Sequence, residues 1–226
     1  MKKFSSALLL LLLSIVSCKN GQPEKAKTVE KEKTILEKVA YAHGYENWDD
    51  VRQLQFTFNV DRDTTHYERN WVWEPGSQEV SMRVASDTVN FNRTTVDSLS
   101  MKADASFIND KYWLLAPYQL VWDQGNFEYE HQEGATAPIS GNKMHKLTIV
   151  YGKEGGYTPG DAYDFYFGDD YLVKEWSFRK ANAPEPSMST TWEDYKDFGG
   201  LLIATMHNNP GSGSKLYFTD LKVTME

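Results

Sequence analysis

The chain has 226 residues, a formal net charge of −8 at neutral pH and a single cysteine. This length suits one β-rich domain or two small ones and is enough for a substantial core. A negative chain without a run of lysine or arginine argues against a nucleic-acid partner and against electrostatic attraction to anionic lipid, because both depend on clustered positive charge.

The first twenty residues, MKKFSSALLLLLLSIVSCKN, have the three parts of a secretory signal. Lys2 and Lys3 form a basic start, residues 7–13 are continuously apolar, and Ser17 is a small residue before Cys18. The apolar stretch is about ten residues long, whereas a membrane-spanning helix needs roughly 20. We therefore expect residues 1–17 to be a signal peptide and not a transmembrane helix.

The segment IVSC at 15–18 resembles the bacterial lipobox. This resemblance implies cleavage before Cys18 and lipidation of its thiol with acyl chains such as palmitate. No intramolecular disulfide can explain the only cysteine, although a soluble secreted protein with a chance cysteine is the alternative. The residue after the cysteine is Lys19. It is not the aspartate that is associated with retention at the inner membrane in the lipoproteins that this segment resembles. We therefore expect an envelope protein, anchored to the outer membrane and facing the periplasm.

Residues 18–27 are polar and predict a lipidated tether, and residues 28–226 predict a single domain. The domain begins with a predicted helix over 29–43, capped by Thr28, with apolar residues at helical spacing and Gly44 after its end. Asn47 is expected to cap a second short segment that leads into the sheet.

Alternating apolar residues then predict a series of strands. The connections between them are short, so most of the strands are expected to be antiparallel. We expect an α+β, mostly β fold: a strongly curved antiparallel sheet of about 10–11 strands, an unclosed barrel, covered by the N-terminal helix and an inserted helix. The positions that predict the strands include Leu54, Phe56, Phe58 and Val60; Tyr67, Trp71 and Trp73; Val80, Met82 and Val84; Phe127, Tyr129 and His131; Leu147, Ile149 and Tyr151; and Tyr163, Phe165 and Phe167.

One long insertion, residues 93–124, interrupts the strands. Its pattern predicts a helix over 105–116 that Asp104 caps and Pro117 ends, followed by an exit strand. The apolar side of the sheet needs a cover, so we expect this segment to pack inside the curve.

No sequence motif fixes a chemistry. The chain lacks phosphate-binding glycine loops, HExxH, CxxC and GxSxG, so neither an enzyme nor a cofactor is expected. Glu128 and Glu130 share a strand face about 7 Å apart, as in an inverting glycosidase, but the simpler interpretation is the solvated side of the strand. Asp61, Asp63 and His66 lie between two strands, where such residues usually form turns, so no metal site is expected.

Aromatic side chains point to an apolar wall. Trp71 and Trp73 share one sheet face with Tyr67, and such a row either fills a core or lines a cavity. The inserted segment supplies the opposite side. The candidate ligand-lining residues are Tyr67, Trp71, Trp73, Ile108, Tyr112, Trp113, Leu115 and Trp122.

Four segments resemble the lipoprotein-localisation carriers (Lol type), and more closely a related family of uncharacterised bacterial envelope lipoproteins. They are AHGYENWDDVRQLQF at 42–56, WLLAPYQLVWD at 113–123, GYTPGDAYDFYF at 156–167 and TWEDYKDFGGLLIATM at 191–206. The resemblance implies a curved, unclosed sheet whose apolar concave face, covered by helices, holds acyl chains. It transfers no catalytic residue. The predicted anchor at Cys18 departs from the soluble carriers and fits membrane-anchored relatives.

These features favour a membrane-anchored lipoprotein that binds a lipid or other hydrophobic ligand in a half-barrel cavity. The alternative is an interaction or sensor module of the envelope, with a core filled by its own side chains and a protein partner on its acidic outer face. A hydrolase using Glu128 and Glu130 is the third interpretation.

Overall fold

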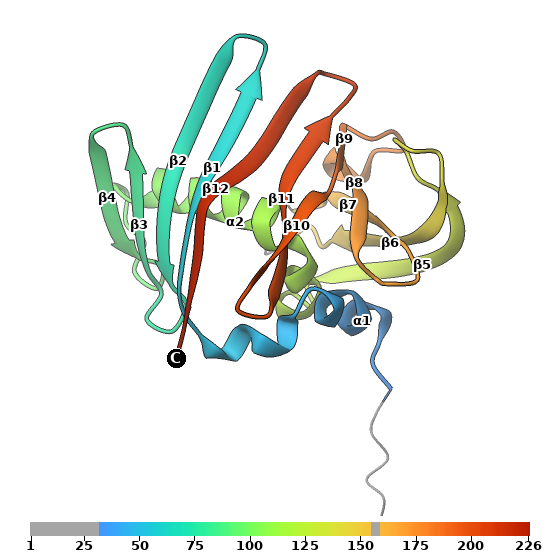
Figure 1. The fold of residues 1–226 in the computed structure, drawn as a ribbon, viewed down its shortest axis with the longest axis horizontal. Helices are drawn as coiled ribbons and strands as arrows, with labels where there is room; N and C mark the ends of the chain where they lie inside the picture. The colour runs from blue at the N-terminus through green and yellow to red at the C-terminus, as the bar shows by residue number, and fades with distance from the viewer. Residues whose placement is uncertain (1–31, 155–158) are drawn as a thin grey trace, which may run out of the picture. The chain divides into compact units, whose positions relative to one another are not determined.

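The computed structural model describes residues 32–154 and 159–226, and antiparallel strands in two sheets make up about half of these residues (Figure 1). The predicted signal peptide, Cys18, the tether at 18–27 and the predicted cap Thr28 lie outside the described residues.

The first sheet has seven strands in the order β10-β11-β12-β1-β2-β3-β4, and the second has five in the order β5-β6-β7-β8-β9. The predicted mostly β, antiparallel and unclosed fold with two helices is therefore confirmed, but its strands form two sheets and not one. The strands are β1 (Val51–Arg62), β2 (Thr65–Glu74), β3 (Glu79–Val84), β4 (Asp87–Asn92), β5 (Phe127–Thr136), β6 (Lys143–Tyr151), β7 (Ala162–Phe167), β8 (Val173–Arg179), β9 (Met188–Thr191), β10 (Glu193–Phe198), β11 (Leu201–Asn209) and β12 (Ser214–Met225).

The two sheets meet where β9 passes beside β11. Only Trp192 separates β9 from β10, which pairs with β11 in the other sheet. The backbone N–H of Asn208 donates to the Thr191 hydroxyl oxygen at 3.0 Å, and His207 Nδ1 lies 3.2 Å from the Thr191 carbonyl oxygen. Side-chain hydrogen bonds thus replace a continuous ladder at this junction.

Helix α1 (Ile35–Ala42) begins later than the sequence predicts. Thr34 caps it, because its hydroxyl accepts from the Glu37 backbone N–H while the Glu37 carboxylate accepts from the Thr34 N–H at 2.6 Å. Gly44, at φ +85°, then starts the 3-10 helix η1 (Tyr45–Asp50). Asn47 does not cap η1; its amide instead donates to the carbonyl oxygen of Gly200 at 3.1 Å.

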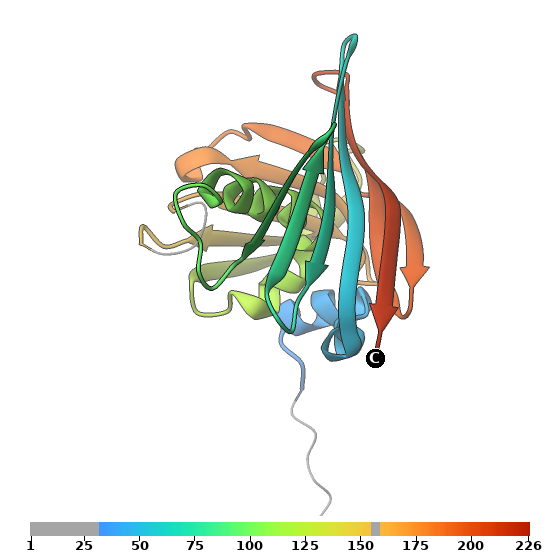
Figure 2. The same ribbon diagram turned by 90° about the vertical axis from the view of Figure 1, so that its left-hand side faces the viewer.

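Helix α2 (Met101–Trp122) is the inserted helix and lies between the two sheets (Figures 1 and 2). The prediction of a helix over 105–116 followed by a strand was wrong at both ends. Pro117 lies inside the helix and distorts it at Leu115, which has φ −126° and ψ 26°. The helix resumes because both sheets and α1 bury it on most sides, and this packing outweighs the hydrogen bond that proline removes.

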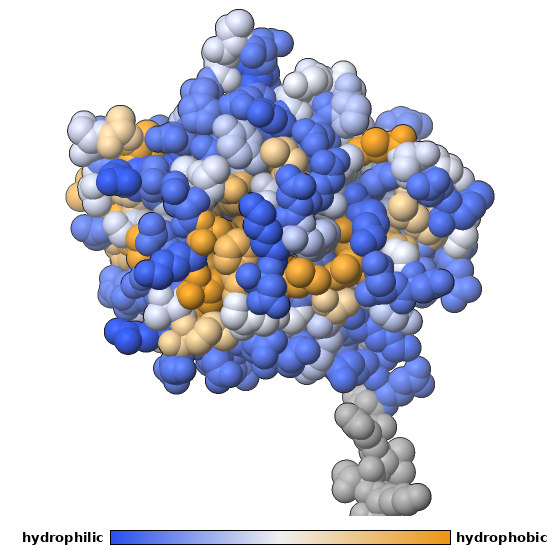
Figure 3. Space-filling view, viewed as in Figure 1, coloured by the Kyte–Doolittle hydropathy of each residue, from blue (hydrophilic) through white to orange (hydrophobic). Residues whose placement is uncertain are grey.

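The core lies around α2 and is rich in aromatic side chains. Trp71 and Trp73 of β2 pack edge to face against Phe107 of α2, with ring centroids 5.3 and 5.4 Å apart. The face of the first sheet that points away from α2 is largely polar, with a group of apolar side chains near its centre (Figure 3). Neither described α-helix combines the length and apolar content needed to cross a membrane.

Candidate ligand-binding cavity

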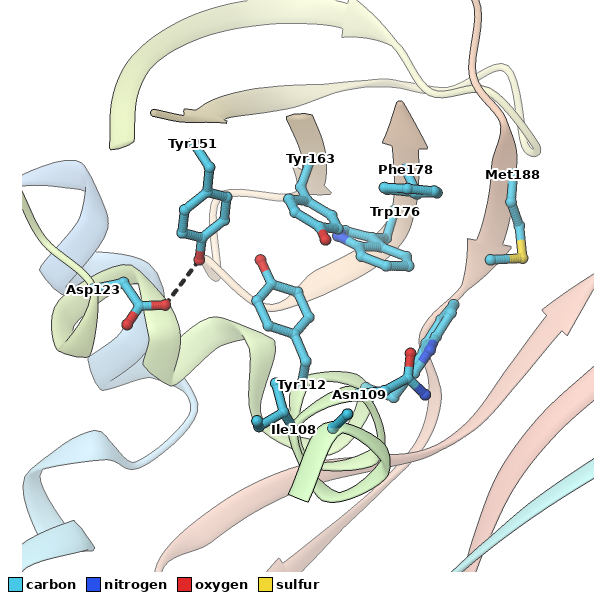
Figure 4. A pocket seen from close by; sticks show the side chains of 11 residues that line it. Ile108, Asn109, Tyr112, Asp123, Tyr151, Tyr163, Trp176, Phe178 and Met188 are labelled. Carbon is cyan, nitrogen blue, oxygen red and sulfur yellow. Dashed lines mark hydrogen bonds between the residues drawn. The ribbon is translucent and has the colours of Figure 1, made fainter. Parts of the chain in front are cut away.

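A cavity of about 340 Å³ lies between α2 and the five-stranded sheet (Figure 4). On the helix side, the lining residues Ala105, Ile108, Asn109 and Tyr112 lie at i, i+3, i+4 and i+7 and therefore share one helix face. Aromatic and apolar side chains form most of the wall. The full lining is Ala105, Ile108, Asn109, Tyr112, Trp113, Asp123, Tyr151, Tyr163, Trp176, Phe178 and Met188.

The sheet side of the cavity is a row of large side chains across three strands. Tyr163 of β7 pairs directly with Phe178 of β8, which pairs with Met188 of β9. Directly paired residues project on the same face of a sheet, so the row faces α2. Figure 4 shows these three side chains across from Ile108, Asn109 and Tyr112.

One end of the cavity is polar. The Tyr151 hydroxyl donates to an Asp123 carboxylate oxygen at 2.9 Å (Figure 4). Burial is the main cause that raises the pKa of Tyr151, and burial also raises the pKa of Tyr112. Both phenols therefore remain neutral at physiological pH, so the cavity keeps uncharged hydroxyl groups and no buried phenolate.

A second cavity, of about 450 Å³, lies beside the first and shares Asn109, Trp113 and Met188 with it. Its other walls come from β1, β2, β9, β11 and β12 and include Phe58, Val60, Tyr67, Thr190, His207 and Leu216. Cationic side chains, Arg62, Arg69 and Lys215, also line this cavity.

Several buried polar atoms in the walls have no hydrogen-bond partner among the described residues. In the first cavity this is the Trp176 indole N–H; in the second they are the Thr190 hydroxyl and His207 Nε2. Buried polar groups are normally paired, so such a concentration marks a place where another molecule could supply the missing partners.

The structure divides the candidate lining residues among three places. Ile108, Tyr112 and Trp113 line the first cavity, and Tyr67, 44% exposed, lines the second. Trp71, Trp73 and Leu115 are in the packed core. Trp122, the last residue of α2, packs against Trp48 of η1, with ring centroids 4.8 Å apart.

Sequence reasoning missed the contribution of the second sheet to this cavity. Tyr151, Tyr163, Trp176, Phe178 and Met188 form one of its walls. The alternation in their strands was a usable signal, since Tyr151 and Tyr163 occupy the apolar positions of two predicted strands. What the pattern could not provide is which strands face α2.

The other candidate groups lie elsewhere. Glu128 and Glu130 are exposed on β5 and line neither cavity. At the β1–β2 hairpin, His66 Nδ1 lies 2.7 Å from an Asp61 oxygen, and Lys215 Nζ lies 3.1 Å from the other Asp61 oxygen. Within the described ranges, no three histidine, cysteine or acidic side chains are grouped so that they could hold a metal ion.

No protein-family model and no curated protein matches the chain. Among solved structures, it is similar to a DUF1329 family protein from Desulfovibrio piger, with 11% identity, coverage of 84% of this chain and 91% of that one, and a TM-score of 0.48. It is also similar to a LolA superfamily protein from Nitrosomonas europaea, with 14% identity, coverage of 85% of this chain and 93% of that one, and a TM-score of 0.46. A third similar structure is an outer membrane lipoprotein-sorting protein domain from Vibrio parahaemolyticus, with 11% identity, coverage of 84% of this chain and 93% of that one, and a TM-score of 0.44.

The Lol-type resemblance found in the sequence thus recurs among the similar structures. At these identities the likeness concerns the fold alone.

Proposed function

We propose that this protein is an envelope lipoprotein, anchored through Cys18, that binds a lipid or another hydrophobic small molecule in the first cavity. The observation that carries this proposal is an aromatic-lined cavity of about 340 Å³ between α2 and the five-stranded sheet. Cavities of roughly 300–1,000 Å³ with mostly apolar walls and a few polar groups are typical of small-molecule sites.

The walls suit a flexible apolar chain. Tyr163 and Trp176 stack with ring centroids 5.3 Å apart and planes within 14°, and Ile108 and Met188 add aliphatic surface. An acyl chain buried against such a surface gains about 0.8 kcal/mol for each methylene removed from water. Because none of these contacts is directional, the first cavity alone would discriminate weakly among apolar chains of similar length.

The proposed organisation has a signal peptide at 1–17, a lipidated tether at 18–27 and a single binding domain at 28–226. Fully extended, a tether of this length reaches about 30 Å. It would keep the domain close to a membrane surface, which is where a lipid ligand would be collected or delivered.

The proposal is tested on the full-length protein purified from the membranes of the cells that produce it. Organic extraction followed by mass spectrometry should recover a lipid or other hydrophobic molecule in near-stoichiometric amount. Ala105→Trp places an indole in the cavity from an exposed helix position and should abolish the co-purification. Met101→Trp adds the same side chain to the same helix at a position that lines neither cavity, and should leave the bound molecule in place.

A folded protein with nothing bound would contradict the proposal, as would equal recovery from Ala105→Trp and the wild type. Cross-linking in cells that captured one dominant protein, with no lipid recovered, would instead favour the envelope interaction module.

A further inference from the structure

Trp113 lies between the two cavities, which share its side chain and those of Asn109 and Met188. Its ring packs 4.5 Å from Trp176 on the first-cavity side and 5.5 Å from His207 on the second, measured between centroids. A ligand that passes Trp113 would therefore have one segment in each cavity, and the middle of the molecule would lie at the junction of the two sheets.

Two buried polar side chains line the second cavity near this junction, and each has one polar atom without a hydrogen-bond partner among the described residues. They are Thr190, 2% exposed, and His207, 0% exposed; the unpaired atoms are the hydroxyl and Nε2. They do not hydrogen-bond to each other. Trp176, directly opposite Thr190 in the β8–β9 pairing, adds an unpaired indole N–H on the first-cavity side.

The hydrogen-bonding roles of His207 and Thr190 follow from their surroundings. The Thr191 carbonyl oxygen, 3.2 Å from His207 Nδ1, can only accept a hydrogen bond, so Nδ1 carries the proton and Nε2 is an acceptor. Burial lowers the pKa of His207 to about 3, so the ring stays neutral at physiological pH. The Thr190 hydroxyl can donate or accept, and the Trp176 N–H can only donate.

We infer that the ligand carries, between two apolar segments, an uncharged group that both donates and accepts hydrogen bonds, which means a hydroxyl or a secondary amide. Its proton would satisfy His207 Nε2 and its oxygen would accept from Thr190. An ester lacks the proton, and a carboxylate offers only acceptors and would be costly to bury there. This inference rests on the proposed function, because it names the ligand class of the same site.

The test compares ligands that differ in this group alone. The full-length lipidated protein is incubated with an equimolar mixture of octadecanoate and octadecanoate hydroxylated at carbon 10 or 12, and the bound species are resolved by native mass spectrometry. For both probes the carboxylate can stay at the edge of the second cavity, near Arg62 and Lys215. We expect about tenfold more of at least one hydroxylated acid, which corresponds to about 1.4 kcal/mol, as for one satisfied buried hydrogen bond.

Thr190→Val keeps the shape of the side chain and removes the hydroxyl, and His207→Leu removes the acceptor. Each should bring the ratio of the bound acids close to one. Thr205→Val is the matched control: Thr205 is also buried, but its hydroxyl already donates to the Asp194 carbonyl oxygen at 2.9 Å, so the tenfold preference should persist.

Equal binding of the acids by the wild type, or a preference retained by both Thr190→Val and His207→Leu, would overturn the inference while leaving the proposed function intact. Binding of neither acid by the folded wild type would count against a ligand of this class. Recovery of no hydrophobic molecule from native membranes would count against the proposed function itself.

Discussion

The Arg69 guanidinium and the Asp110 carboxylate form a bidentate pair, with Nε to Oδ2 at 2.7 Å and Nη2 to Oδ1 at 2.6 Å. The Asp110 side chain is fully buried, and the Trp71 indole N–H donates to it at 2.8 Å. Because Arg69 and Trp71 belong to β2 and Asp110 to α2, this pair fixes the helix to the seven-stranded sheet and holds the helix face that forms the cavity.

Asp110→Asn should destabilise the protein by about 3 kcal/mol, since it leaves the Arg69 charge without its partner in a mostly buried place. The free energy of unfolding in urea measures this change. Asp170→Asn is the control at the surface: Asp170 pairs with Lys174 at 3.0 Å but its side chain is 50% exposed, and its loss should cost about 1 kcal/mol or less. Equal losses in the two variants would contradict the assigned role of Asp110.

The buried histidines should make stability fall as the pH decreases. Burial is the main cause that lowers the pKa of His43 to about 4 and that of His207 to about 3. Above pH 6.5, both histidines are neutral in the folded and the unfolded chain. Below pH 6.5, the unfolded chain takes up protons that the folded chain does not, so each histidine removes about 1.4 kcal/mol of stability per pH unit until its folded pKa is reached.

This pH dependence is measured by urea unfolding at pH 7, 6, 5 and 4. His43→Gln should flatten the curve between pH 6.5 and 4 relative to the wild type, whatever it does to the stability at pH 7. His66 offers a control of opposite sign, because hydrogen bonding to Asp61 raises its pKa in the folded state. Its small stabilisation is present below the unfolded pKa and is lost as the pH rises through the folded one. His66→Gln should therefore steepen the fall slightly, and a flattening equal to that of His43→Gln would refute the assignment.

Gly44 should tolerate no side chain, for two reasons that can be separated. Its φ of +85° disfavours an L-residue, and a Cβ atom there would overlap the carbonyl oxygen of Gly200. Gly125 has a similar φ of +102° but open space around it. Gly125→Ala should therefore cost about 1 kcal/mol of stability, the price of the backbone conformation alone.

Gly44→Ala should cost several kcal/mol, because relief of the overlap requires movement of the chain at Gly200 as well. Chemical unfolding of both variants gives the comparison. Similar losses at Gly44 and Gly125 would show that the contact between residues 44 and 200 adapts without cost.

The sequence predicted the strands and the presence of both helices because their signals are local. Alternation over a few residues, as at Leu54, Phe56 and Phe58, identifies a strand without any knowledge of its partners. The extent of α2 could not be predicted in this way. Pro117 is a strong local stop signal, and only the packing of the helix between two sheets, which the local pattern does not contain, keeps the chain helical beyond it.

The candidate site likewise has residues that local sequence signals identify and residues whose role only tertiary packing decides. Tyr112 and Trp113 could be identified because they lie in the one apolar insertion, and Trp71 was an equally good candidate by pattern. Whether such a residue lines a cavity or fills the core depends on contacts with residues far away in the sequence. Trp71 packs edge to face against Phe107 and donates to Asp110, whereas Trp113 lines both cavities. Periodicity does not distinguish the two outcomes.

The predicted anchor gives a prediction that is independent of the cavity. Cells supplied with radiolabelled palmitate should label the wild-type protein, whereas Cys18→Ala removes the only thiol in the chain and should give an unlabelled protein. Because cleavage is expected to require the lipidated cysteine, the variant should also keep residues 1–17 and migrate as a larger species. Ser17→Ala preserves a small residue before Cys18 and is the matched control, which should remain labelled and processed. Labelling of Cys18→Ala would refute Cys18 as the site of lipidation. Absence of label from the wild type, with processing of both variants at the same position, would show that the chain is an ordinary secreted protein whose cysteine follows the apolar stretch by chance.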